Sequence, residues 1–66
     1  MKPGLLGNTI RQARIDNKLT QEQLAELVQI TPTHLKHIES EHRKPSIEVL
    51  FALADVLHFS LDAMLM

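Results

Sequence analysis

Polar side chains that carry no negative charge recur at helical spacing between residues 32 and 40. At about 100° per residue, Leu35 and Ile38 define the apolar side of a helix, and Glu39 tilts back towards that side. Four side chains fall on the opposite side: Thr33, Lys36, His37 and Ser40. Hydroxyl, ammonium and imidazole groups hydrogen-bond to base edges and phosphate oxygens. A helix of about 13 Å matches the roughly 12 Å width of the DNA major groove, so this face favours contact with DNA.

Three histidines, His34, His37 and His42, raise the alternative of a metal site, because imidazole is the commonest ligand of transition metals. On a helix the rings of His34 and His37 point about 60° apart, and no carboxylate or cysteine stands ready as a further outward ligand. Polar surface histidines are the simpler interpretation, with His37 contacting a base edge. We therefore expect no metal ion and no cofactor.

Capping signals divide the first two thirds of the chain into helices that position this face. Thr20 followed three residues later by Gln23 is a capping box, in which each side chain bonds to the backbone N–H of the other residue. Thr31 before Pro32 is a second start signal, because the missing N–H of proline is not needed at the first helical position. With the spacing of the apolar residues, these signals predict helices over residues 6–16, 21–28 and 32–40.

The remainder of the chain predicts two more helices. Ser46 restarts the chain after a polar loop at residues 41–44, and Ser60 is placed to cap a last short helix. The fourth helix has an apolar stripe of Ile47, Leu50, Leu53, Ala54 and Leu57, widened by Phe51 and Val56. The sequence thus predicts an all-α fold with five helices in one domain over residues 6–65, after a flexible lead at 1–5.

Composition excludes several classes of protein. The 66 residues contain no cysteine, which excludes disulfides and thiolate chemistry, and no Ser/His/Asp constellation or Gly-rich phosphate loop, so we expect no enzyme. No apolar run approaches the roughly 20 residues of a membrane span, and we expect a cytoplasmic protein. The net charge of −1 hides an uneven distribution, with +3 over residues 1–18 and −3 over residues 46–66. One end of the molecule is therefore suited to face an anion.

Several segments in order carry a resemblance to a known family. They are residues 20–27 (TQEQLAEL), Ile30-Thr31, Leu35 with Ile38-Glu39, Lys44-Pro45-Ser46, and the apolar spacing from Leu50 to Leu61. Together they resemble the phage-repressor (Cro/cI or XRE) helix-turn-helix family over residues 6–65. The resemblance implies a lambda-repressor-like DNA-binding domain with its helix-turn-helix at about 21–40. It also implies a dimeric transcriptional regulator, most simply a repressor, that places its third helix in the major groove of a double-stranded operator.

Individual positions carry over from this resemblance. The base-reading positions are Pro32, Thr33, Lys36 and His37. The phosphate-binding positions are Thr20, Gln21, His34, Ser40, Arg43 and Lys44. Arg14 and Glu39 match a pair that often forms a salt bridge between the first and third helices. The chain departs from the family at Gln29 and Glu41, where glycine is frequent, and Glu41 would put a negative charge near the expected phosphate path.

The sequence leaves open the role of its apolar C-terminal residues and two alternatives to the DNA-binding function. The apolar residues Phe59, Leu61, Met64 and Leu65 exceed what a short terminal helix needs, so they either form a dimer contact or dock onto the preceding helix. The same fold also serves as a protein-interaction module, such as an antitoxin or adaptor, and its acidic segment 46–66 would then bind a protein partner. A third alternative is that the chain is the DNA-binding fragment of a longer regulator.

Overall fold

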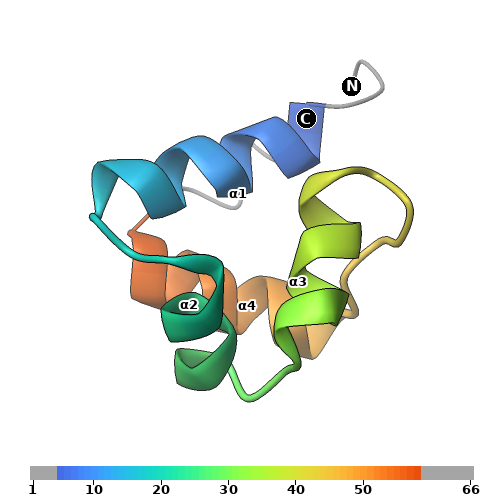
Figure 1. Cartoon of the computed structure of the whole chain (residues 1–66). Coiled ribbons are helices and arrows are strands. Elements are labelled where there is room, and N and C mark those ends of the chain that lie inside the picture. Colours follow the sequence, from blue (N-terminus) through green and yellow to red (C-terminus); the bar gives the residue numbers. More distant parts are fainter. Residues whose placement is uncertain (1–4, 59–66) are drawn as a thin grey trace.

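Four α-helices account for most of residues 5–58, the part of the chain that this computed structural model describes. They are α1 (Leu5–Asp16), α2 (Gln21–Leu27), α3 (Pro32–Glu39) and α4 (Ile47–Leu57), and no strand occurs among these residues (Figure 1). The all-α expectation is confirmed for this part. The expected fifth helix after Ser60, and the apolar residues Phe59, Leu61, Met64 and Leu65, lie outside the described residues, as do residues 1–4 of the expected lead.

The starts of three helices follow the predicted capping signals. The Thr20 hydroxyl accepts from the backbone N–H of Gln23 at 3.0 Å, and the Gln23 side chain accepts from the N–H of Thr20 at 2.9 Å. At the start of α3 the Thr31 hydroxyl accepts from the backbone N–H of His34 at 3.0 Å, and Pro32 occupies the first helical position. Ser46 caps α4. These local signals fix where the helices begin, because each satisfies backbone donors that a helix start leaves free.

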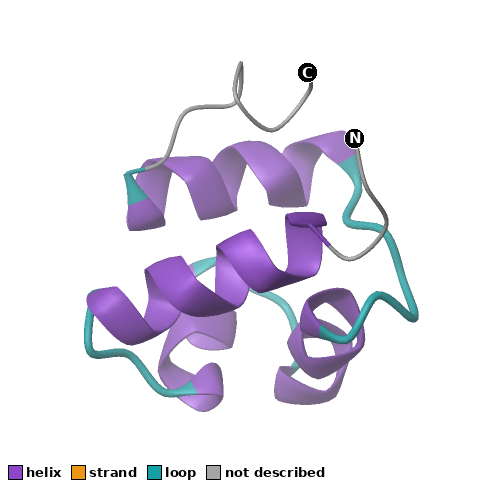
Figure 2. Cartoon of the chain, turned by 90° about the horizontal axis from the view of Figure 1, so that it is seen from above, coloured by secondary structure: helices purple, strands orange, loops and turns teal. Residues whose placement is uncertain are grey.

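The four helices surround a small aliphatic core. Helices α1 and α4 lie side by side when the molecule is seen from above, with α2 and α3 on the other side of α1 (Figure 2). All four contribute to one buried cluster, which is Ile10, Leu24, Ala25, Val28, Leu35, Ile38, Leu53 and Leu57. This packing holds α2 and α3 at a fixed angle and turns the polar side of α3 outward.

The apolar stripe expected for α4 is wrong at one edge. Ile47 was expected on that stripe but is 62% exposed, and Phe51 is 55% exposed. The buried residues Leu50, Leu53 and Leu57 point in one direction on the helix. At about 100° per residue, Ile47 and Phe51 point roughly 85° and 125° away from that direction, so they leave the face that meets α1 and the core.

Three helices end in a Schellman motif whose left-handed residue is not glycine. After α2, Ile30 donates to the carbonyl oxygen of Ala25 at 2.9 Å around Gln29, whose φ is 61°. The same pattern closes α1 around Lys18 and α3 around Glu41, with φ of 59° and 68°. Side chains with a Cβ resist this conformation by about 1 kcal/mol. Gln29 and Glu41, where glycine was expected from the resemblance, therefore adopt the left-handed backbone conformation that glycine usually supplies.

We expect Gln29→Gly to stabilise the protein by about 1 kcal/mol, because it relieves the left-handed strain. Urea unfolding followed by helical circular dichroism measures this. The control is Glu26→Gly, an exposed helical position of α2, which should destabilise the protein by about 1 kcal/mol. A loss of stability in Gln29→Gly would contradict the strain argument.

Helix α1 approaches the C-terminal end of α3 closely at Gly7, which is buried. A Cβ at this position would lie 2.9 Å from the carbonyl oxygen of Ile38 and 2.7 Å from Oε1 of Glu41. The Gly7 N–H also donates to that Glu41 carboxylate. Only a residue without a side chain allows this contact between the two helices.

Gly7→Ala should therefore destabilise the protein by about 1–3 kcal/mol, although alanine is the better helix former. Thermal unfolding of the variant tests this. Asn8→Ala, at an exposed position one residue along α1, serves as the control and should be neutral or slightly stabilising. If both variants gain stability, the close approach does not constrain the fold.

Candidate nucleic-acid interface

The outward face of α3 has the composition and orientation that the sequence predicted. Leu35 and Ile38 are buried, and the residues predicted to read bases, Pro32, Thr33, Lys36 and His37, are all exposed, as is Ser40. His34 is half-buried at the start of the helix, where its N–H donates to the Thr31 hydroxyl at 3.0 Å. The outward face of α3 therefore contains neutral and cationic side chains and no carboxylate. The contacts of these residues with DNA stay predictions.

The loop after α3 folds back onto the end of that helix. The carbonyl oxygen of His37 accepts from the N–H groups of His42 and Arg43 at 2.9 and 3.2 Å. Arg43 and Lys44 are exposed beside this turn. The loop that contains Arg43 and Lys44 is thereby held beside the C-terminal end of α3.

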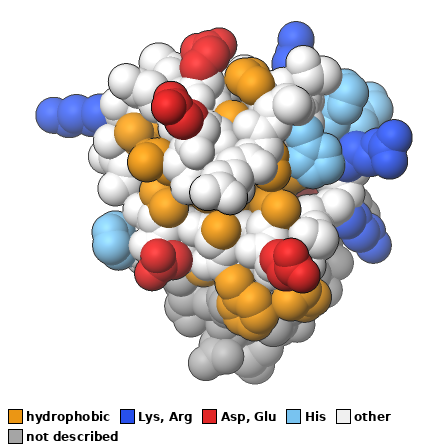
Figure 3. All heavy atoms as spheres, turned by 90° about the horizontal axis from the view of Figure 1, so that it is seen from below, with side chains coloured by type: hydrophobic (Ala, Val, Ile, Leu, Met, Phe, Trp, Pro, Cys, Tyr) orange, Lys and Arg blue, Asp and Glu red, His pale blue; other side chains and the backbone are white. Residues whose placement is uncertain are grey.

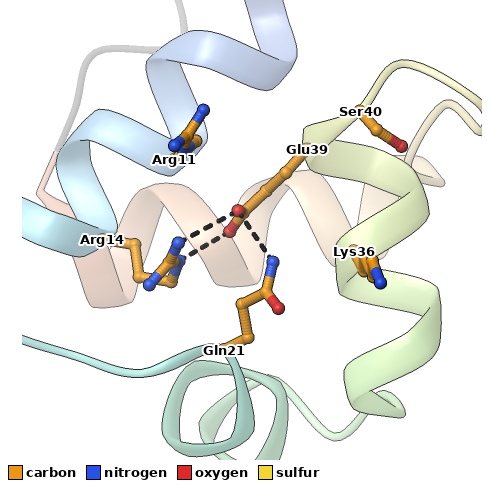
Figure 4. Close-up of a pocket in the computed structure, with 6 residues that line it drawn as sticks. All are labelled: Arg11, Arg14, Gln21, Lys36, Glu39 and Ser40. Carbon is orange, nitrogen blue, oxygen red and sulfur yellow. Dashed lines mark hydrogen bonds and ion pairs between the residues drawn. The ribbon is translucent and has the colours of Figure 1, made fainter.

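The predicted salt bridge between Arg14 and Glu39 is present and almost buried. Arg14 Nε lies 2.7 Å from Glu39 Oε2, and the two side chains are 13% and 4% exposed. Arg14 Nη2 lies 3.2 Å from Glu39 Oε1, and Arg14 Nη1 donates to the carbonyl oxygen of Leu19 at 2.9 Å. This network joins α1, α3 and the loop before α2, and Figure 4 shows the part of it between Arg14 and Glu39.

Gln21, predicted to hold a phosphate, also bonds to Glu39. Its Nε2 donates to Glu39 Oε1 at 3.1 Å, which leaves the second N–H of the amide for another acceptor. Thr20, just before it, is exposed and uses its hydroxyl oxygen to cap α2. The side chain of Gln21 is thus oriented by the same carboxylate that anchors Arg14.

An open hollow of about 350 Å³ lies between α1, α2 and α3 (Figure 4). Its lining residues are Arg11, Arg14, Gln21, Lys36, Glu39 and Ser40. Sequence reasoning missed Arg11 as a member of this surface. The signal was available, since Arg11 precedes Arg14 by three residues on α1 and so shares its face. The exposed Arg11 adds a positive charge beside the outward face of α3, which itself contains Lys36.

Glu41 makes a contact across the fold that the sequence did not predict. Its carboxylate accepts a hydrogen bond from the N–H of Gly7 in the first turn of α1, and the expectation that its charge lies near a phosphate path stays a prediction. That N–H is one of the donors that a helix start leaves free, and a negative charge there is favourable. Glu41 therefore caps α1 across the fold.

Charge is separated over the surface of the described residues. Helices α2 and α4 contain Glu22, Glu26, Glu48 and Asp55 and no Lys or Arg. Figure 3 shows His side chains beside Lys and Arg side chains at the right-hand edge, with Asp and Glu side chains among hydrophobic ones on the face in view. The α3 side is thus suited to a polyanion despite the net charge of −1.

Neither a metal site nor a membrane span emerges from residues 5–58. No three His, Cys, Asp or Glu side chains are grouped there as a metal ion requires. No helix in the same range has the length and apolar character needed to cross a membrane.

A helix-turn-helix family model matches residues 10–64. The chain belongs to this family, the XRE type of helix-turn-helix protein. It is 36% identical over 58 residues to the immunity repressor protein of Bacillus phage phi105, covering 88% of this chain and 40% of that one. It is 33% identical over 61 residues to control protein C.SmaI of Serratia marcescens, covering 92% of this chain and 73% of that one. This helix-turn-helix chain thus spans less than half of the phage repressor.

Solved structures agree with the family. The N-terminal DNA-binding domain of SinR from Bacillus subtilis matches with a TM-score of 0.84 and 28% sequence identity, over 96% of this chain and 93% of that one. SinR in complex with DNA matches with a TM-score of 0.83 and 28% identity, over 94% of this chain and all of that one. The segment predicted as the helix-turn-helix, about residues 21–40, contains α2 and α3.

We expect Glu39→Ala to lower the free energy of unfolding by about 3 kcal/mol, because it leaves the Arg14 guanidinium buried without its partner. Urea denaturation measures this, with Arg11→Ala as the control that should change stability by less than about 0.5 kcal/mol. The double variant Arg14→Met with Glu39→Leu should lose less stability than the sum of the losses measured for Arg14→Met alone and Glu39→Leu alone. Additive losses would mean that the ion pair does not couple the helices.

Proposed function

We propose that this helix-turn-helix chain is a sequence-specific DNA-binding transcriptional regulator, most simply a repressor that acts in the cytoplasm by occupying an operator. The observation that carries this proposal is the exposed face of α3, which contains Thr33, Lys36 and His37 and no carboxylate. Its neighbour SinR, solved in complex with DNA, supports the proposal. The proposed activity is binding, without a catalytic step.

The proposed mechanism divides the contacts into two groups. Thr33, Lys36 and His37, with Pro32 beside them, read base edges in the major groove. Backbone phosphates are held by Thr20, Gln21, His34, Ser40, Arg43 and Lys44, and these contacts fix the register of α3 on the duplex. Glu39 supports both groups because it fixes Gln21 and joins α3 to α1.

The proposed regulator binds as a homodimer. Two copies would place their α3 helices about 34 Å apart, one turn of the duplex, and read a pseudo-palindromic operator. The proposed dimer contact comprises Phe59, Leu61, Met64 and Leu65. Doubling the readout is needed because one short helix contacts only a few base pairs.

We expect His37→Ala to cost about 1–3 kcal/mol at the preferred site and to relax one base position. Arg43→Ala should instead weaken binding to all sequences by similar amounts, since a phosphate contact carries no sequence information. Fluorescence anisotropy with the preferred site and with random duplex measures both. Equal losses on the two DNAs for both variants would refute the division of roles.

The experiment that tests the function itself is selection of binding sites from random duplexes, repeated at two salt concentrations. Enrichment of a pseudo-palindrome, with affinity that falls steeply as salt rises, is the expected result. Without enrichment, the reading role of α3 fails.

A second candidate is a protein-interaction module, favoured by the exposed Ile47 and Phe51 beside Glu48 and Asp55 on α4. Docking through such an apolar surface depends weakly on salt, because it does not release counterions from a polyanion. The same salt series therefore separates the two candidates.

A further inference from the structure

Two histidines lie together where α3 ends. The ring centroids of His37 and His42 are 6.1 Å apart with planes tilted by 59°. His42 Nδ1 lies 2.8 Å from the Ser40 hydroxyl oxygen, and the N–H of His42 donates to the carbonyl oxygen of His37 at 2.9 Å. Both side chains are exposed. Two hydrogen bonds therefore hold His42 beside the C-terminal end of α3.

The carboxylates nearest in sequence to this pair are engaged elsewhere. Glu39 bonds to Arg14 and Gln21, and Glu41 accepts from the N–H of Gly7. Within residues 5–58 the structure forms no ion pair between a carboxylate and either ring. A positive charge on these imidazoles would thus meet no negative charge from these two neighbours.

The other charged groups around the pair are cations. Lys36 precedes His37 on α3, and Arg43 and Lys44 follow His42 in the basic loop. From α1, Arg11 lines the hollow that Lys36 and Ser40 also line. Histidine side chains lie next to Lys and Arg side chains at one edge of the molecule (Figure 3). This group of cations therefore favours a negatively charged ligand beside His42.

We propose that His42, with His37 beside it, binds a backbone phosphate of DNA as an imidazolium, so that DNA affinity rises as pH falls. This inference rests on the proposed DNA-binding function and deepens it. Imidazole is the side chain that changes charge near neutral pH. A phosphate stabilises the charged form, so binding is coupled to proton uptake. His42 lies beyond the last turn of α3 and next to Arg43, which suits a phosphate better than a base edge.

The test measures affinity for duplex DNA at constant salt by fluorescence anisotropy, at about pH 6 and about pH 8. We expect the wild-type protein to bind about fivefold more tightly at the lower pH. His42→Asn should remove most of this difference, since asparagine offers Ser40 a polar atom but does not titrate. His42→Lys should bind at the higher pH about as tightly as wild type does at the lower one, because its charge is permanent.

His58→Asn is the matched control. His58 is also exposed, but it lies at the end of α4 with φ of 60°, a conformation that asparagine tolerates. This variant should keep the full pH dependence of the wild type. Circular dichroism at both pH values confirms that each variant is folded.

Calorimetry in two buffers of different ionisation enthalpy gives a second readout. Proton uptake on DNA binding by wild type, reduced in His42→Asn, supports the proposal. DNA binding with no pH dependence, or with a pH dependence that is undiminished in His42→Asn, overturns the proposal and leaves the proposed function intact. Absence of DNA binding at either pH overturns both.

Discussion

The arrangement of the helices depends on one carboxylate. Glu39 is the last residue of α3 and one of the few charged groups with little exposure, and it receives bonds from Arg14 on α1 and Gln21 at the start of α2. A buried carboxylate is tolerated only when such partners replace its water. Because the partners come from different helices, satisfying Glu39 also sets how α3 sits against α1 and α2.

The same arrangement leaves the outward face of α3 without a free carboxylate. Glu39 and Glu41 lie within a few residues of Lys36 and His37 in the sequence, yet Glu39 is paired with Arg14, and Glu41 bonds to the first turn of α1. The cations Lys36, Arg43 and Lys44 remain exposed. A chain with net charge −1 thereby gains a surface suited to phosphates. Net charge is a poor guide here because a polyanion meets one side of the molecule.

Helix ends provide the second structural theme. The chain has only two glycines, and neither occupies the left-handed positions after α1, α2 and α3. One of them, Gly7, is used where α1 meets α3. The cost of left-handed Lys18, Gln29 and Glu41 is offset by the backbone bonds of the Schellman motifs. Glu41 gains a further bond through its side chain, so this departure from the family has a compensating contact.

Local features of the sequence determined much of this protein by themselves. Thr20, Thr31-Pro32 and Ser46 define the helix starts, and the period of Leu35 and Ile38 defines the outward face of α3, because capping and helical spacing act within a few residues. The Arg14–Glu39 pair was predictable only through the family resemblance. Packing alone decided the rest. The exposure of Ile47 and Phe51, the hollow beside Arg11, the cap that Glu41 gives α1 and the pairing of His37 with His42 all depend on how separate segments meet. No local period encodes the angle between two helices, so only the tertiary structure decides those contacts.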